Sequence, residues 1–160
     1  MSYLIHFPEF WQDPIDWELV DVTAMHEVLR DDHDHDWTPM DLAIKYASVD
    51  TLRRLIEMGA TLHKHPKQSS GERLFETDDP EKLEYLIEQG EDVNRYTAGS
   101  LATPLHHHVA NQSLEAIRVL LRHGADVNVQ NCWKETPLQL ACKVGHQEIV
   151  AELVKYGSAV

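Results

Sequence analysis

The sequence predicts an all-α fold built from a repeated helical unit, and two observations support this prediction. Three stretches share a Thr-Pro start and then continue as a helical pattern: Thr38-Pro39-Met40-Asp41, Thr103-Pro104-Leu105-His106 and Thr136-Pro137-Leu138-Gln139. Each Thr is followed, at the same distance, by a glycine that ends a second helix: Gly59, Gly124 and Gly157. In this register the apolar residues lie three and four positions apart, which is the spacing of one buried helical face.

A fourth, degenerate copy starts at Ser69, at the same distance before Gly90. Its second helix has the expected apolar residues at Leu83, Leu86 and Ile87. Its first helix is predicted to be short, because Gly71 stands where leucine is expected and the run Thr77-Asp78-Asp79-Pro80 interrupts it. Pro80 suits the first turn of the helix that follows.

The repeat has a period of about 33 residues, and together with its motifs it resembles the ankyrin repeat. The motifs are Thr-Pro-Leu-His at 103–106, Gly-Ala-Asp-Val-Asn at 124–128 and Gly-Glu-Asp-Val-Asn at 90–94. The resemblance covers residues 38–160. It implies a stacked solenoid of helix-turn-helix units with β-hairpin fingers. Within 37–160 the copies are expected at 38–68, 69–102 (degenerate), 103–135 and 136–160.

The motif residues have local roles. The Thr hydroxyl can cap the first helix, and a glycine after the second helix accepts a left-handed backbone. Only the third copy keeps the motif histidine, His106, because Asp41, Glu72 and Gln139 replace it elsewhere. Lys134 stands at a finger position where the family usually has glycine, so that finger is expected to be reshaped.

The two ends of the repeat region differ. Residues 1–36 do not match the repeat, but they contain a helix start at Asp13-Pro14 and an apolar stripe, so an N-terminal helical cap is expected. The last copy carries Val144, Ile149 and Val154 with little polar cover. A monomer that tolerates this end and a weak dimer through the C-terminal repeat both stay open.

Composition and charge limit the classes of function. The 160 residues hold 14 Lys plus Arg against 27 Asp plus Glu, a net charge of −13. This length suits one domain, and the charge argues against nucleic acid and anionic membranes as partners. No export signal and no apolar run of about 20 residues is present, so we expect a cytoplasmic protein. Cys132 and Cys142 are expected to be free thiols, with Cys142 at a small buried position.

The acidic residues fall into two blocks. Residues 1–36 carry a net charge of −9 and residues 72–92 a net charge of −7. They are either solvated faces or a docking surface for a basic protein partner.

The resemblance implies that finger tips and the concave side of the first helices contact the partner. Aromatics in the fingers and charged residues at these positions are therefore the candidates. For Trp37 and Trp133, packing on their own repeat is the alternative. The candidate binding residues are Asp34, His35, Asp36, Trp37, Lys45, Tyr46, Glu76, Asp78, Asp79, Tyr96, Trp133 and Lys143.

Enzyme and cofactor motifs are missing from the sequence. It has no phosphate-binding glycine loop, nucleophile elbow or Cys-x-x-Cys. The run 106–108 cannot chelate one ion from a helix, because consecutive side chains point about 100° apart. The pairs His33/His35 and His63/His65 could chelate if extended, but they lack a clear third ligand. We therefore expect no cofactor and no catalytic activity.

Three functional hypotheses follow. The first is an acidic inhibitor or immunity protein that neutralises a basic protein, since bacterial toxin immunity proteins include ankyrin-like members of this size. The second is a scaffolding adaptor in a protein complex. The third, from another class, is a small metal-dependent hydrolase that uses the His and Asp cluster.

Overall fold

A computed structural model describes residues 29–30, 36–37, 39–60 and 72–157. The N-terminal helical cap expected over residues 1–36 lies almost wholly outside this part of the chain. The chain forms two compact units, Met1–Gln68 and Ser69–Val160, and each is described by itself. Within the described residues no helix is long and apolar enough to cross a membrane.

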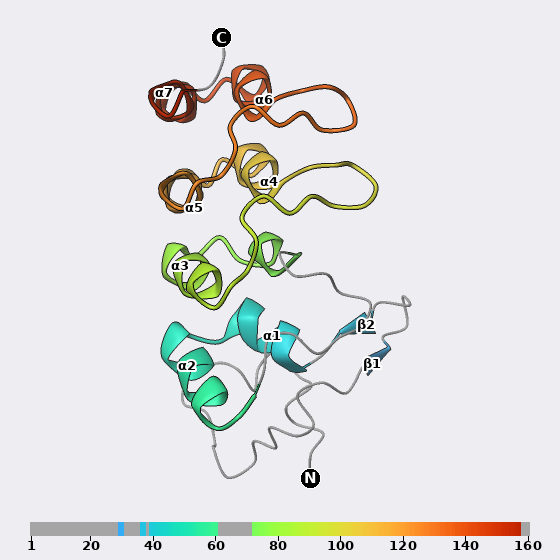
Figure 1. The fold of residues 1–160 in the computed structure, drawn as a ribbon, viewed down its shortest axis with the longest axis vertical. Helices are drawn as coiled ribbons and strands as arrows, with labels where there is room; N and C mark the ends of the chain where they lie inside the picture. The colour runs from blue at the N-terminus through green and yellow to red at the C-terminus, as the bar shows by residue number, and fades with distance from the viewer. Residues whose placement is uncertain (1–28, 31–35, 38, 61–71, 158–160) are drawn as a thin grey trace. The chain divides into compact units, whose positions relative to one another are not determined.

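The first unit contains a short strand pair and two helices. The antiparallel strands β1 (Leu29–Arg30) and β2 (Asp36–Trp37) precede helices α1 (Pro39–Tyr46) and α2 (Val49–Glu57) (Figure 1). The Ser48 hydroxyl caps α2 by accepting a hydrogen bond from the Thr51 amide at 3.3 Å. Four large apolar side chains of this unit are fully buried: Met40, Ile44, Leu52 and Leu55.

The second unit is two rows of helices. One row contains the 3-10 helix η5 (Glu72–Phe75), α4 (Pro104–Ala110) and α6 (Pro137–Val144). The other contains α3 (Pro80–Glu88), α5 (Leu114–Arg122) and α7 (Gln147–Lys155). Neighbours within each row are in contact, and so are α4 with α5 and α6 with α7 (Figure 1). Each row therefore runs through copies two, three and four.

The predicted register is confirmed by the second helix of every copy. Helices α2, α3, α5 and α7 all begin eleven residues after the predicted copy starts at 38, 69, 103 and 136. The glycine after each of these helices has a positive φ, as the left-handed end of a helix requires. The four residues are Gly59 (98°), Gly90 (99°), Gly124 (84°) and Gly157 (87°).

The short first helix of the second copy is also confirmed. Only the four-residue η5 forms there, and α3 begins at Pro80. The Asp79 carboxylate caps α3 by accepting a hydrogen bond from the Glu81 amide at 3.0 Å. The run Thr77–Pro80 therefore both ends one helix and starts the next.

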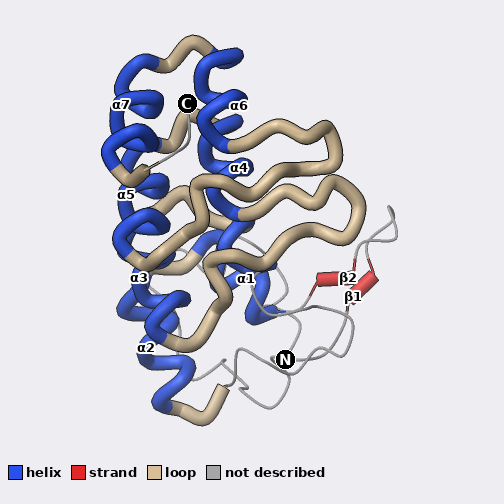
Figure 2. The backbone as a smooth tube through the Cα atoms, turned by 45° about the horizontal axis from the view of Figure 1, so that its top comes forward, coloured by secondary structure: helices blue, strands red, loops and turns tan. Residues whose placement is uncertain are grey.

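Two loops project from the second unit on the same side, at 91–103 and 125–136 (Figure 2). They consist of turns, and in their described residues no strand is assigned. The Cys132 amide of the later loop donates to the Ser100 carbonyl of the earlier one at 2.8 Å. Lys134 has a φ of 60°, and Leu101, at the equivalent position, has 51°. Both loops thus keep the left-handed backbone that the family takes with glycine, so the reshaping expected at Lys134 does not occur at this turn.

The helix faces supply the first test of the fold. Leu86 and Leu120 are fully buried at equivalent positions of α3 and α5. We expect Leu86→Ala and Leu120→Ala each to lower the free energy of unfolding by about 2 to 5 kcal/mol, because each leaves a cavity. Urea unfolding followed by far-ultraviolet circular dichroism measures the change. Val154→Ala is the control, since 45% of Val154 is exposed and a change within about 0.5 kcal/mol is expected there. Losses at both leucines as small as the control's would show that the register is wrong.

Candidate protein-interaction site

Three large apolar side chains gather on the two projecting loops. Tyr96 is 57% exposed, Leu101 43% and Trp133 68%. We call these three residues the finger patch. The backbone holds them near one another, because Thr97, next to Tyr96, exchanges hydrogen bonds with Leu101 and Ala102, and Cys132, next to Trp133, bonds Ser100. Exposed aromatics on an ordered loop are the residue type that contributes most to protein interfaces.

The structure decides between two interpretations of Trp133. Its exposure means that it does not pack on its own repeat. Leu101 was not identified from the sequence, since it belongs to no periodic apolar face and its exposure depends on the left-handed turn. Tyr96 and Trp133 are therefore the sequence-predicted candidates that the second unit places on adjoining loops.

The charged candidates on first helices are paired with neighbours. On α6, the Lys143 ammonium lies 3.0 Å from the Glu135 carboxylate. This hydrogen bond lowers the pKa of Glu135. On α1, the Lys45 ammonium lies 5.7 Å from the centre of the Tyr46 ring, and Tyr46 is 40% exposed. Neither lysine is thus an isolated positive charge.

Much of the acidic block at 72–92 is used by the fold. The Asp78 carboxylate accepts hydrogen bonds from the His108 ring at 3.0 Å and from the Ser113 hydroxyl at 2.9 Å. Glu91 forms a buried ion pair with Arg73 at 3.3 Å. Further members cap α3 (Asp79) or lie near Arg122 and His123 (Glu84). Glu76, the remaining candidate here, is half-buried directly after η5.

The other sequence-predicted candidates are only partly within the described structure. Asp34 and His35 lie outside it. Asp36 and Trp37 form β2, whose backbone pairs with β1.

The motif histidine of the third copy is a structural residue. His106 is 1% exposed, and its Nδ1 accepts from the Thr103 amide at 3.3 Å and lies 2.9 Å from the Thr103 hydroxyl. Its Nε2 donates to the Glu135 carbonyl at 3.0 Å. Burial lowers the pKa of His106, against the smaller opposing effect of that carbonyl. The neutral ring satisfies every one of these contacts. In the fourth copy Gln139 replaces it, with its side-chain oxygen 2.9 Å from the Thr136 amide.

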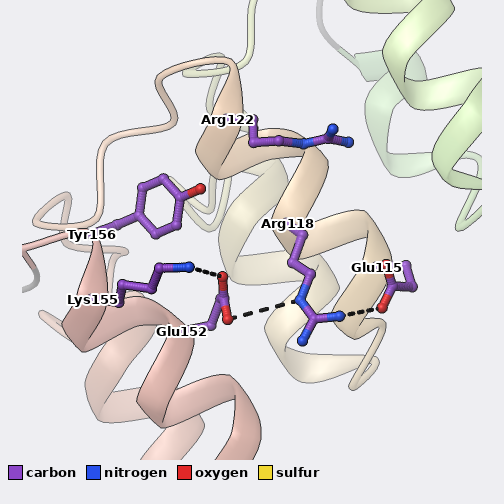
Figure 3. Close-up of a pocket in the computed structure, with 6 residues that line it drawn as sticks. All are labelled: Glu115, Arg118, Arg122, Glu152, Lys155 and Tyr156. Atoms are coloured by element: carbon purple, nitrogen blue, oxygen red, sulfur yellow. Dashed lines mark hydrogen bonds and ion pairs between the residues drawn. The ribbon is translucent and has the colours of Figure 1, made fainter.

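A hollow of about 430 Å³ lies between α5 and α7 (Figure 3). Its charged groups neutralise one another: Arg118 bonds Glu115 and lies 3.8 Å from Glu152, which also pairs with Lys155 at 3.4 Å. Arg122 lies 3.8 Å from Glu84. Each cation that lines the hollow thus already faces a carboxylate.

Metal ligands and thiols were the remaining chemical candidates. No three His, Cys, Asp or Glu side chains cluster as a metal site in the described ranges, and His33, His35, His63 and His65 lie outside them. Cys132 and Cys142 are free and exposed. The expectation that Cys142 is buried was wrong. Its equivalent Val109 is buried in the third copy, whereas the fourth copy has no further copy against it in the described residues.

Comparisons with known proteins agree with the repeat architecture. A family model described as ankyrin repeats, in three copies, matches residues 75–160. The chain is 39% identical over 92 residues to a probable E3 ubiquitin-protein ligase, XBOS33, of Oryza sativa subsp. japonica, an alignment that covers 55% of this chain and 18% of that protein. It is 29% identical over 129 residues to NF-kappa-B inhibitor zeta of Bos taurus, with 73% and 18% covered. It is 29% identical over 138 residues to the putative ankyrin repeat protein FPV031 of Fowlpox virus, with 81% and 39% covered.

The lowered pKa of His106 predicts a pH effect on stability. The stability that this neutral ring contributes is fully present above the pKa of an unfolded histidine, about 6.5, and is lost as the pH falls toward the lower folded value. His106→Gln, which introduces the residue used at Gln139, should remove this contribution. Wild type should therefore lose more stability than the variant between pH 7.5 and 5.5, as measured by urea midpoints. His123→Gln on the exposed end of α5 is the control, and equal losses in wild type and H106Q would contradict the assignment.

The exposure of both cysteines predicts their reactivity. Cys132 and Cys142 should each react with a thiol reagent in the native protein, without denaturant. Titration should give about two thiols per chain, and Cys132→Ser should remove one of them. A native protein that yields none, while the unfolded chain yields two, would show that these positions are covered.

Proposed function

Because the chain belongs to the ankyrin repeat family, we propose that it is a non-catalytic protein-binding module that engages its partner through the finger patch. The observation that supports this proposal is the exposure of Tyr96, Leu101 and Trp133 on two hydrogen-bonded loops. Ordered loops lose little conformational freedom on binding, so aromatic residues on them give affinity at low entropic cost. None of the three side chains is required to fill the helical core.

The more specific proposal is an acidic inhibitor, of the immunity-protein kind, that neutralises a basic protein. The net charge of −13 supports it, since complementary charge accelerates association and disfavours acidic competitors. One of the relatives is an inhibitor by name, NF-kappa-B inhibitor zeta, and resembles 73% of this chain. Four acids carry the proposed electrostatic contribution: Asp34, Asp36, Asp78 and Asp79.

A scaffolding adaptor is the second candidate function. It is supported by the relatives named as E3 ubiquitin-protein ligases, of which this chain spans about a fifth. In such an arrangement the repeats would hold a second protein near another activity without blocking it. An inhibitor must cover a functional site of its partner, whereas an adaptor leaves that site open. The partner's activity in the complex therefore distinguishes the two.

The finger patch is tested first, because it does not depend on the sign of the partner's charge. The wild-type chain and a Tyr96→Ala/Trp133→Ala variant serve as parallel baits in one lysate of the source cells. We expect a protein that is enriched on the wild type and reduced at least about tenfold on the variant. Loss of an aromatic hot spot costs about 2 kcal/mol or more, and about 1.4 kcal/mol corresponds to a tenfold change in affinity. Met58→Ala/Tyr156→Ala, which removes two large exposed side chains outside the finger patch and outside the other candidate positions, should retain the protein. Loss on both variants would contradict a site at the finger patch.

The acidic contribution is then measured on the captured protein. Replacement of Asp34, Asp36, Asp78 and Asp79 by Asn should slow association by about tenfold at low salt, with the difference vanishing at high salt. The control has the same change in net charge on second helices: Asp50→Asn, Glu57→Gln, Glu115→Gln and Glu148→Gln. Equal association rates for the two variants would mean that the acidic blocks are solvated faces, and the partner need not be basic.

A further inference from the structure

Position 108 carries a histidine where two other copies carry alanine. The equivalent residues are Ala43 in the first copy and Ala141 in the fourth, both fully buried. His108 is also fully buried, with its side chain 0% exposed. A large polar ring thus occupies a core position of α4, and it must find hydrogen-bond partners there.

Both ring nitrogens of His108 face acceptors from the second copy. Nε2 lies 2.8 Å from the Leu74 carbonyl oxygen, and Nδ1 lies 3.0 Å from a carboxylate oxygen of Asp78. A carbonyl can only accept, and an ionised carboxylate can only accept. The Asp78 side chain is 60% exposed, so water stabilises its ionised form. Both contacts are therefore made together only by an imidazolium, which carries a proton on each nitrogen.

The second copy needs these contacts because its first helix is so short. The last carbonyls of any helix lack partners within it, and η5 has just four residues. Its Leu74 carbonyl is bonded by the His108 ring, and Asp78, in the turn before α3, is held by the same ring and by Ser113. The ring thus ties both η5 and the turn after it to the third copy.

Other charged groups described on the packed elements have partners of their own. On η5, Arg73 pairs with Glu91, and on α6, Lys143 pairs with Glu135. On α5, Arg118 pairs with Glu115 of the same helix and with Glu152 of α7 (Figure 3). Arg122, and His123 directly after the helix, lie near Glu84. On α4 itself, the His107 ring lies 5.2 Å from that of His108, and its Nε2 accepts from the Asn111 amide group at 2.9 Å. Burial, with His108 as a further cause and Asp78 opposing it, lowers the pKa of His107.

We propose that His108 is a pH-sensitive latch between the second and third copies. As an imidazolium it holds both Leu74 and Asp78. When it loses the Nδ1 proton it keeps Leu74 but turns a lone pair toward the Asp78 carboxylate, and this exposed side chain then leaves the ring for water. The turn between η5 and α3 is tied to the third copy in acid and loosened in alkali. The latch lies within one unit and does not depend on the proposed partner.

Nitrogen-15 NMR of the histidine ring tests the proton positions in the wild-type chain. At pH 5.5 both nitrogens of His108 should be protonated, and at pH 8 only Nε2 should be. A neutral ring at pH 5.5, or a proton on Nδ1 rather than Nε2 at pH 8, would overturn the latch.

Amide hydrogen exchange tests the consequence for the fold, with Asp78→Asn as the informative variant. An asparagine can accept from a protonated Nδ1 or donate to a bare one, so D78N should hold the ring at either pH. Exchange is followed at the Glu76 and Leu83 amides, which are bonded to Arg73 and Asp79 on the two sides of Asp78. At each pH the exchange protection of these two amides in wild type is divided by their protection in D78N. This ratio should fall by about two- to fivefold between pH 5.5 and 8, which is the size of effect expected from a half-exposed ion pair.

Two further variants separate the latch from general charge effects. Glu81→Gln removes the same charge from the same exposed segment, and its protection relative to wild type should not change with pH. In a His108→Gln background, D78N should have the same effect at both pH values, since no titrating ring faces position 78. A pH-independent ratio for D78N, or the same pH dependence in E81Q or with His108→Gln, would refute the proposal.

Discussion

Within the second unit each copy packs its helices against those of the next, and this dependence explains why a degenerate copy persists inside the row. The second copy has only one turn of first helix, yet Leu83 and Leu86 are fully buried, like their equivalents in the first and third copies. It also contains a buried ion pair, Arg73–Glu91, with Glu91 at a position that is alanine in the first and third copies. The desolvation of two buried charges offsets much of their attraction, so this pair is weak evidence of added stability, although removing one partner would leave a buried charge. The third copy contributes the contacts that the second lacks.

The three consecutive histidines show how position in the repeat assigns different roles to one residue type. His106 accepts at Nδ1 and is satisfied as a neutral ring, whereas His108 faces two acceptors and is satisfied when charged. His107, between them, accepts from Asn111 and packs edge-on against Phe75. Successive helical side chains point in different directions, so the three rings have separate environments. A fall in pH therefore disfavours the contacts of His106, which need a neutral ring, and favours those of His108, which need a charged ring.

The fold was predictable from the sequence because its signals repeat. A Thr-Pro start, an apolar face and a glycine recur at fixed distances, so one correct alignment positions every second helix. The contacts of Asp78 were not predictable, because they join residues 30 or more positions apart in a copy that departs from the motif. Leu101 was missed for a related reason, since its exposure follows from a left-handed turn at a non-glycine residue. Net charge along the chain indicated the acidic block but not which acids the fold uses.

This division within the acidic block affects how a basic partner could be bound. Asp78 and Asp79 serve the latch and the cap of α3, so a partner that takes either must compete with an internal hydrogen bond. Glu81 and Glu88 are exposed and lie outside the ion pairs described above. Such exposed acids can attract a basic partner from a distance without breaking any of these internal hydrogen bonds. Under the proposed function, charge on α3 would therefore steer an approaching basic partner while contact is made at the loops. Under that proposal, the exposed apolar area of Tyr96 and Trp133 would then determine how long the complex lasts, because desolvation at an interface acts mainly on dissociation.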